Sequence, residues 1–152
     1  MIKVLKHNKI DKKSWDDCIH KSFNGNVYAL SWYLDIIHPE WDALVENNYE
    51  RVMPLTCSKK FGLSYMFQPF FAQQLGVFST SQLSQEDVER FINAIPKQYL
   101  LTQYRLNSYN KVDYDSEIIA RHRNVELDLI YDYQYLYNNY NNNTKRNLAK
   151  AE

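Results

Sequence analysis

Polar and apolar residues in the N-terminal part of the chain follow the spacing of helices with one buried face. Ile2, Val4 and Leu5 predict a short edge strand or an extended lead-in, and Asp11 is placed to cap a helix. The inner face of that helix is formed by Trp15, Cys18, Ile19 and Ser22. Asn24 and Gly25 are expected to end it, because both tolerate a positive φ. A second short helix ends before Pro39 and has one face formed by Leu30, Tyr33, Leu34 and Ile37.

From Trp41 onward the period falls to two, which is typical of strands. The first strand is predicted to be half-buried, with Trp41, Ala43 and Val45 alternating with Asp42, Leu44 and Glu46. A second strand runs from 49 to 57, so Pro54 must lie where its missing N–H is not needed. The aromatic stretch Leu63–Phe78 is predicted as a third strand that ends beside a pocket. The three strands together predict an antiparallel meander.

The second half of the chain begins with the clearest helix signal. Ser84 and Asp87 have the spacing of a capping box, Pro96 ends the helix, and its buried stripe is Val88, Phe91, Ile92 and Ile95. A strand is predicted at 100–106, a polar surface segment at 107–123, and a further strand at Val125, Leu127 and Leu129. A short amphipathic helix follows, with Tyr133, Leu136, Tyr137 and Tyr140 on one face. Thr144 is predicted to cap a last basic turn or two.

Composition limits the classes of function. A chain of 152 residues is expected to form one domain, and its 18 basic and 18 acidic side chains cancel. This balance argues against an overall positive electrostatic field that would attract nucleic acid or an anionic membrane. Cys18 and Cys57 have neither disulfide-framework nor zinc-ligand spacing, so both are predicted to be core residues and no metal site is expected. Without a signal-peptide h-region or a spanning apolar run, a cytoplasmic location is expected.

The order of predicted elements and several runs of residues resemble the N-terminal half of FemAB-like proteins, which are tandem GNAT-fold acyltransferases, in a branch common in Bacteroidetes. The runs are WYLDIIHPEWDALV (32–45), VMPLT (52–56), KKFG (59–62), QPFFAQQLGVF (68–78) and NNTKRNLAKA (142–151). The resemblance implies an α/β (α+β) domain over 1–131, with a mixed, mostly antiparallel sheet and helices on both faces. Residues 132–152 would then be a C-terminal helix that crosses toward a second GNAT-like half.

In this resemblance the N-terminal half supplies framework and part of an acceptor pocket, and the other half holds the activated acyl donor. The expected partners are therefore a second GNAT-like half or a second copy of the chain, and a small-molecule or amine acceptor. Nucleic acid is not expected, except as a tRNA-linked donor in the parent family. No cofactor is expected in this domain.

A GNAT pyrophosphate loop would present backbone N–H groups to the phosphates after a strand and before a helix. The corresponding residues here are Gln73, Leu75, Gly76 and Val77. Phe78 stands where a small residue is required, and its ring would block the close approach of the backbone. The loop is therefore a weak candidate for acyl-CoA binding.

The candidates for an acceptor pocket are Gln68, Phe70, Gln73, Gln74 and Trp32. A glutamine in an apolar stretch needs a hydrogen-bond partner, which can be either the neighbouring backbone or a ligand. Phe70 and Trp32 have core packing as their alternative role. The basic cluster Lys145, Arg146 and Lys150 is either a solvated helix face or a contact with an anionic donor or the second half.

No catalytic residue is predicted, because His7, His20, His38 and His122 lie outside any nucleophile signature and a structural role suffices for His38 at a helix end. Asp42, Glu46, Glu126 and Asp128 are predicted to lie on the solvated side of strands. Three functions are compatible with the sequence: an acceptor-side lobe of a FemAB-like enzyme, inactive alone; a stand-alone acetyl-CoA-dependent N-acetyltransferase; and an interaction module that docks through its C-terminal helix.

Overall fold

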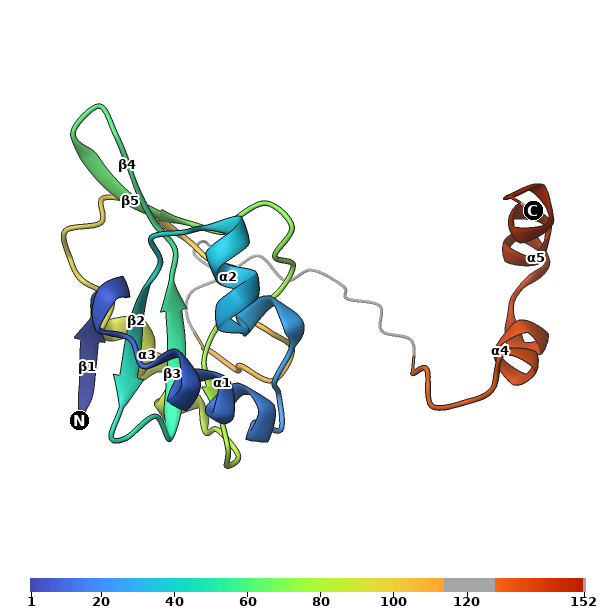
Figure 1. Ribbon diagram of the computed structural model, residues 1–152, viewed down its shortest axis with the longest axis horizontal. Coiled ribbons are helices and arrows are strands. Elements are labelled where there is room, and N and C mark those ends of the chain that lie inside the picture. Colours follow the sequence, from blue (N-terminus) through green and yellow to red (C-terminus); the bar gives the residue numbers. More distant parts are fainter. Residues whose placement is uncertain (114–127, 152) are drawn as a thin grey trace. The chain divides into compact units, whose positions relative to one another are not determined.

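The computed structural model describes residues 1–113 and 128–151, which fall into two compact units, Met1–Ile119 and Ala120–Glu152 (Figure 1). The first unit is a mixed α+β structure with two small sheets. Its elements are β1 (Ile2–Leu5), η1 (His7–Lys9), α1 (Lys12–Lys21), η2 (Val27–Ala29), α2 (Ser31–Ile37), β2 (Asp42–Glu46), β3 (Arg51–Leu55), β4 (Cys57–Lys60), β5 (Leu63–Phe67), β6 (Phe78–Ser79), α3 (Gln85–Asn93) and β7 (Thr102–Gln103). The second unit contains α4 (Tyr133–Asn139) and α5 (Asn142–Ala151).

The first sheet is antiparallel and has the strand order β1-β2-β3-β6. The predicted edge strand β1 is confirmed. The Pro54 carbonyl accepts a hydrogen bond from the Tyr104 hydroxyl at 2.7 Å, so this residue's hydrogen-bonding edge faces away from β2. On that edge β6 pairs only with Arg51 and Val52. The missing N–H of Pro54 therefore interrupts no ladder, as predicted.

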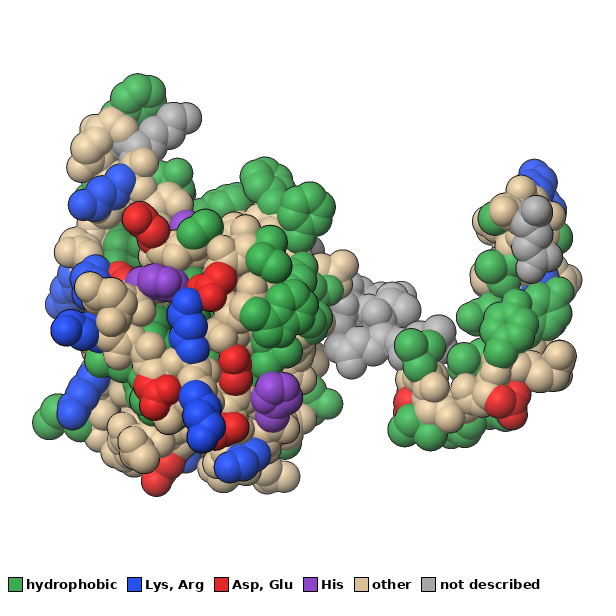
Figure 2. Space-filling view, in the orientation of Figure 1, with side chains coloured by type: hydrophobic (Ala, Val, Ile, Leu, Met, Phe, Trp, Pro, Cys, Tyr) green, Lys and Arg blue, Asp and Glu red, His purple; other side chains and the backbone are tan. Residues whose placement is uncertain are grey.

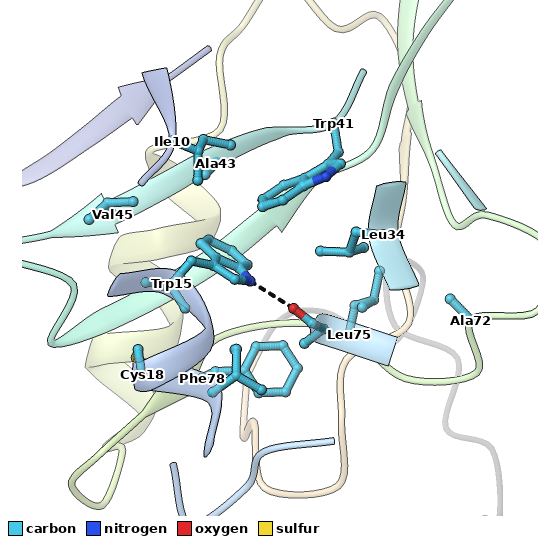
Figure 3. Close-up of a cluster of buried hydrophobic side chains, with 13 residues drawn as sticks. Ile10, Trp15, Cys18, Leu34, Trp41, Ala43, Val45, Ala72, Leu75 and Phe78 are labelled. Atoms are coloured by element: carbon cyan, nitrogen blue, oxygen red, sulfur yellow. Dashed lines mark hydrogen bonds between the residues drawn. The ribbon is translucent and has the colours of Figure 1, made fainter. Parts of the chain in front are cut away.

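Helices cover both faces of this sheet. On one face Trp15 and Leu34, from α1 and α2, pack against Trp41 and other buried side chains that include Ala43, Val45 and Phe78 (Figure 3). The Trp15 indole donates to the Ala29 carbonyl at 2.7 Å, the bond dashed in Figure 3. On the other face Val88 and Phe91 of α3 pack with Leu44, Met53, Leu55, Met66 and Val77. This two-sided packing is the mixed α/β arrangement that the sequence predicts.

The predicted helices of the first unit are confirmed, with one correction to their ends. Asp11 accepts from the Lys13 and Ser14 amides, and Ser84 and Asp87 form the expected capping box. The helix α1 ends because Ser22 is extended, and neither Asn24 nor Gly25 has a positive φ. Gly25 is needed for a close approach instead, since a Cβ there would lie 2.2 Å from the Ile19 carbonyl oxygen.

The prediction of a half-buried β2 is wrong, because all five of its residues are buried. Asp42 and Glu46 are buried rather than solvent-facing, and each has a cationic partner. Lys6 binds Asp42 at 2.7 Å, while Arg51, at 2.8 Å, and Arg90 bind Glu46. Burial alone would raise the pKa of Glu46, but the hydrogen bonds from Arg51 and Arg90 outweigh it and keep the pKa below its ordinary value of 4.5.

The three-stranded meander is also wrong. The run from 49 to 57 is divided at Thr56 into β3 and β4, and β4 belongs to a second sheet with the order β4-β5-β7. Of the predicted strand Leu63–Phe78, β5 covers only Leu63–Phe67 and β6 the last position. Asn107 and Asn110 are buried, so the segment after β7 is not wholly a surface excursion. Val125, Leu127 and Glu126 lie outside the described residues, and Leu129 and Asp128 are exposed and not in a strand.

In the second unit, the helix predicted around Tyr137 is confirmed as α4. The next helix begins earlier than predicted, because Asn141 rather than Thr144 is its cap: the Asn141 side chain accepts from the Thr144 amide at 2.8 Å. Neither helix has a buried residue. Among the described residues of the whole chain, no helix is long and apolar enough to cross a bilayer.

Candidate functional site

A surface loop interrupts the pairing of two parallel segments in the first unit. Met66 and Phe67 pair with Thr102 and Gln103, and the parallel alignment resumes where Leu75 bridges Leu106. Residues 68–74 on one side are therefore opposed only by residues 104–105 on the other, and the longer segment loops outward. We call this segment the 68–74 loop. Its position explains why the predicted strand does not run through to Phe78.

The 68–74 loop is fixed by its own side chains and by α2. Gln68, which is buried, donates to the Ala72 carbonyl at 3.0 Å and accepts from the Arg105 amide at 3.2 Å. The Tyr33 hydroxyl donates to the Phe71 carbonyl at 2.8 Å. Phe71 has a φ of 69°, an uncommon conformation for a bulky side chain. Phe70 and Phe71 are each 82% exposed, so the loop holds two phenyl rings in solvent.

A groove of about 480 Å³ lies between the loop, the end of α2 and the β4–β5 hairpin. Its walls are largely apolar, and its lining residues are Ile36, Ile37, His38, Ser58, Tyr65, Phe67, Pro69, Phe70 and Phe71. Ser58 and Tyr65 are cross-strand partners in the hairpin, so both project from the same face, and Phe67 follows at the period-two spacing. We call this space the aromatic groove. A second groove of about 290 Å³ on the loop includes Gln73, Gln103 and Arg105 among its lining residues.

His38 is the ionisable group with the most useful chemistry in the aromatic groove. Its Nε2 lies 2.9 Å from the Cys57 carbonyl oxygen, which can only accept, so Nε2 carries the hydrogen. In the neutral ring, Nδ1 then has the lone pair, and no described residue is hydrogen-bonded to it. An unprotonated Nδ1 can accept a hydrogen bond or a proton from a ligand. The histidine is held in this orientation by its position at the end of α2, where its amide donates to the Leu34 carbonyl at 2.8 Å.

The amides of the suggested phosphate loop are used inside the protein. The Leu75 amide donates to the Arg105 carbonyl at 2.9 Å, and the Val77 amide donates to Asn110 Oδ1 at 2.7 Å. Burial raises the pKa of the Tyr104 hydroxyl, and the Gly76 backbone acts against that rise. All three residues are buried. Phe78 is fully buried. It is therefore a core packing residue and does not border an accessible phosphate-binding loop.

Three buried asparagines surround Val77 and explain the glycine next to it. The Val77 carbonyl lies 2.9 Å from Asn24 Nδ2, 3.0 Å from Asn110 Nδ2 and 3.5 Å from Asn107 Nδ2. Gly76 has a φ of 111°, and a Cβ there would lie 2.2 Å from Asn110 Oδ1. A side chain at Gly76 would therefore collide with the asparagine that satisfies Val77. Gly76 is therefore required by the close approach of Asn110. This requirement explains why a glycine stands at the position that resembles a phosphate-loop glycine.

The structure brings only part of the predicted pocket together. Phe70 lines both grooves, and Gln68 and Gln73 line the second. The Gln68 side chain is at the same time hydrogen-bonded to backbone groups of the protein. Gln74 accepts from the Ser108 amide at 3.2 Å. Trp32 is 53% exposed on α2 and is not among the residues that line either groove. Phe70 and Trp32 are both exposed, so the alternative prediction that they pack in the core is wrong.

The basic cluster lies in the second unit and has local partners. Lys145 donates to the Asn138 carbonyl at 3.1 Å and lies 5.3 Å from the centre of the Tyr137 ring. Arg146 donates to Asn143 Oδ1 at 2.5 Å, and Lys150 is exposed in the last turn of α5. The described residues contain no group of three or more His, Cys, Asp or Glu side chains placed to hold a metal ion.

Sequence reasoning missed His38, Ser58 and Tyr65 as groove residues. Period-two spacing could have placed Tyr65 and Phe67 on one face, but the turn that aligns Ser58 with Tyr65 had to be known first. His38 enters the groove only because β4 passes the end of α2. Comparisons with protein-family models, with curated proteins and with solved structures found no match to this chain.

Proposed function

We propose that the first unit is a GNAT-like, acceptor-side lobe of a FemAB-like acyltransferase, with the aromatic groove as part of its acceptor site. The order of elements supports this proposal: a strand and two helices precede antiparallel strands, and α3 leads into a strand that runs parallel to β5. The mixed α+β architecture is common to many functions, so the order of elements does not carry the proposal by itself.

The observation that carries the proposal is the use of the Leu75 and Val77 amides by Arg105 and Asn110. A pyrophosphate needs several free N–H groups at one place, usually with a helix N-terminus behind them. Here the following helix opens with Glu86 and Asp87, whose negative charge opposes a phosphate. The alternative of a stand-alone acetyl-CoA-dependent enzyme therefore receives no support from this segment, and the acyl donor belongs to a second half or a second copy.

The groove suits an amine with an apolar body. Phe67, Phe70 and Tyr65 give it aromatic walls, which bind apolar groups through burial of surface. His38 Nδ1 can accept a hydrogen bond from an N–H of the neutral amine, whose nitrogen lone pair is the nucleophile. When this nitrogen attacks an activated acyl carbon and the donor's leaving group departs, the nitrogen carries one proton too many, and His38 Nδ1 can take that proton. The lobe alone would bind and orient the acceptor. Acyl transfer would also require the half that holds the acyl donor.

An NMR titration of the 152-residue chain with 2-phenylethylamine tests the proposal, with 2-phenylethanol as a matched probe lacking the amine. We expect the amine to shift the resonances of His38, Tyr65 and Phe67 and to bind more tightly than the alcohol. His38→Ala should remove this preference, whereas His20→Ala, at an exposed position of α1, should leave it unchanged. Equal binding of the two probes, or shifts confined to residues outside the groove, would contradict the proposal.

A further inference from the structure

Two phenylalanines of the first unit combine high exposure with a left-handed backbone. Phe61 is 90% exposed with a φ of 51°, and Phe71 is 82% exposed with a φ of 69°. A positive φ is costly for a bulky side chain, and asparagine or glycine is the usual residue there. Neither ring gains much burial within the protein in return. Such outliers cluster at functional sites, which makes the two exposed rings candidates for a functional surface.

The first of these residues lies in a turn whose preferred sequence is different. Lys60 pairs with Leu63, so Phe61 and Gly62 form the two-residue turn of the β4–β5 hairpin, and both have a positive φ. Such type I′ turns favour Asn-Gly. The chain has Phe-Gly instead and places a phenyl ring at the tip of the hairpin. The second residue, Phe71, is exposed in the 68–74 loop.

Other exposed apolar side chains join these two positions along β5. The Leu100 amide donates to the Ser64 carbonyl at 3.0 Å and the Met66 amide to the Leu101 carbonyl at 2.9 Å, so 100–101 lie beside the strand. We call the resulting surface the apolar rim, formed by Phe61, Leu63, Phe67, Phe70, Phe71 and Leu101, all of which are exposed. In Figure 2, hydrophobic side chains gather over α2 and the loop, with a smaller hydrophobic patch at the hairpin tip, whereas most charged side chains lie lower on the same face.

Two features of the apolar rim favour a lipid bilayer over a folded protein as its partner. Its most exposed residues project from convex parts of the surface, the tip of a hairpin and the outside of a loop. A folded protein partner would need a separate complementary pocket for each ring. A fluid bilayer accepts separate projections without shape complementarity. In addition, the only charged residues between Val52 and Gln85 are Lys59 and Lys60, next to Phe61. Cations beside exposed aromatic residues are typical of segments that bind anionic lipid surfaces.

The exposed tryptophan Trp32 is connected to the loop through Tyr33, since the two rings lie 5.5 Å apart. Trp32 and Ile36 are on the solvent side of α2, 53% and 71% exposed, and Tyr33 of this helix is bonded to Phe71. Tryptophan is enriched at the boundary between lipid and water. We infer that the apolar rim, with Trp32 beside it, inserts at the surface of a membrane that contains anionic lipids. The apolar rim shares Phe67, Phe70 and Phe71 with the aromatic groove. The inference does not rest on the proposed function, however, since it uses neither His38 nor an acceptor.

The test uses the full chain with vesicles of phosphatidylcholine alone and of phosphatidylcholine mixed with phosphatidylglycerol. Trp15 and Trp41 are fully buried, so Trp32 reports vesicle contact through its fluorescence. We expect its emission to move to shorter wavelength and to be quenched by brominated lipids. Binding should be about fivefold tighter on the mixed vesicles for each lysine that reaches the surface.

The double variant Phe61→Asn, Phe71→Asn separates this role from a structural one. Asparagine tolerates a positive φ, so resistance to urea should be unchanged or higher, while vesicle affinity should fall at least about tenfold. Val4→Thr, an apolar-to-polar change at an exposed position of β1, should leave affinity unchanged. Absence of binding to both vesicle types, or equal affinity of the double variant, would overturn the inference. So would a wild-type dimer that the double variant converts to monomer, since the rim would then join two copies.

Discussion

Replacement of Asn110 by alanine probes the packing that makes the 75–77 segment unavailable to phosphate. The Asn110 side chain is buried, accepts from the Val77 amide at 2.7 Å and lies 3.0 Å from the Val77 carbonyl oxygen as a donor. In the variant the Val77 N–H loses its partner, at a cost of about 1–3 kcal/mol for a buried polar group. The carbonyl keeps Asn24, so the second lost bond adds only about 1 kcal/mol. The expected loss of unfolding free energy is therefore about 2–4 kcal/mol.

Urea unfolding followed by circular dichroism measures this loss, provided that the slope with denaturant stays the same. Asn93→Ala, at an exposed position of α3, is the control and should change stability by less than about 0.5 kcal/mol. If Asn110→Ala costs no more than the control, the Val77 amide does not depend on this side chain. The reasoning that excludes a phosphate site here would then fail.

Three further predictions concern neighbouring parts of the first unit. Gly76→Ala should lower the free energy of unfolding less in the Asn110→Ala background than in the wild type, because the added Cβ would collide with Asn110 Oδ1. A double-mutant cycle measured by urea unfolding gives this difference, and additive losses of stability would refute the prediction. Ser84→Ala should lower the urea-measured stability by about 1 kcal/mol through loss of the capping box, whereas Gln85→Ala, at an exposed position of the same helix, should be nearly neutral; equal effects would contradict the role of the cap. Stability should fall in acid: the folded pKa of Glu46 is lowered, so its ion pairs stabilise fully above its ordinary value of 4.5 and are lost as pH falls through the lower folded value. Glu46→Gln should flatten that acid dependence in urea titrations, and an unchanged slope with pH would count against the assignment.

Local signals in the sequence predict the helices well, since their caps and stripes depend on nearby residues. Asp11 and Ser84 cap the helices as predicted, and Trp15 and Phe91 face the core. The burial of the strands is harder to predict, because an alternating pattern does not show whether another element covers the polar face of the strand. Asp42 and Glu46 look like solvent-facing residues, but long-range partners such as Arg90 make their burial possible.

The candidate site was predicted only in outline. The aromatic stretch at 63–78 does mark the groove, yet a break in strand pairing, which periodicity cannot show, pushes Phe70 and Phe71 outward. Gln68 was correctly expected to need a hydrogen-bond partner, and its partners are backbone groups. His38, Ser58 and Tyr65 meet through tertiary contacts between α2 and the hairpin. Those contacts have no local signature in the sequence.

The account depends most on the claim that this lobe receives an acceptor and does not hold a phosphate-bearing acyl donor. The most direct test is an NMR titration of the 152-residue chain with acetyl-coenzyme A that follows the backbone amides of 75–77. We predict that the amides of Leu75 and Val77, already bonded to Arg105 and Asn110, keep their chemical shifts and slow hydrogen exchange. Saturable shifts of these amides on addition of acetyl-coenzyme A would contradict the claim.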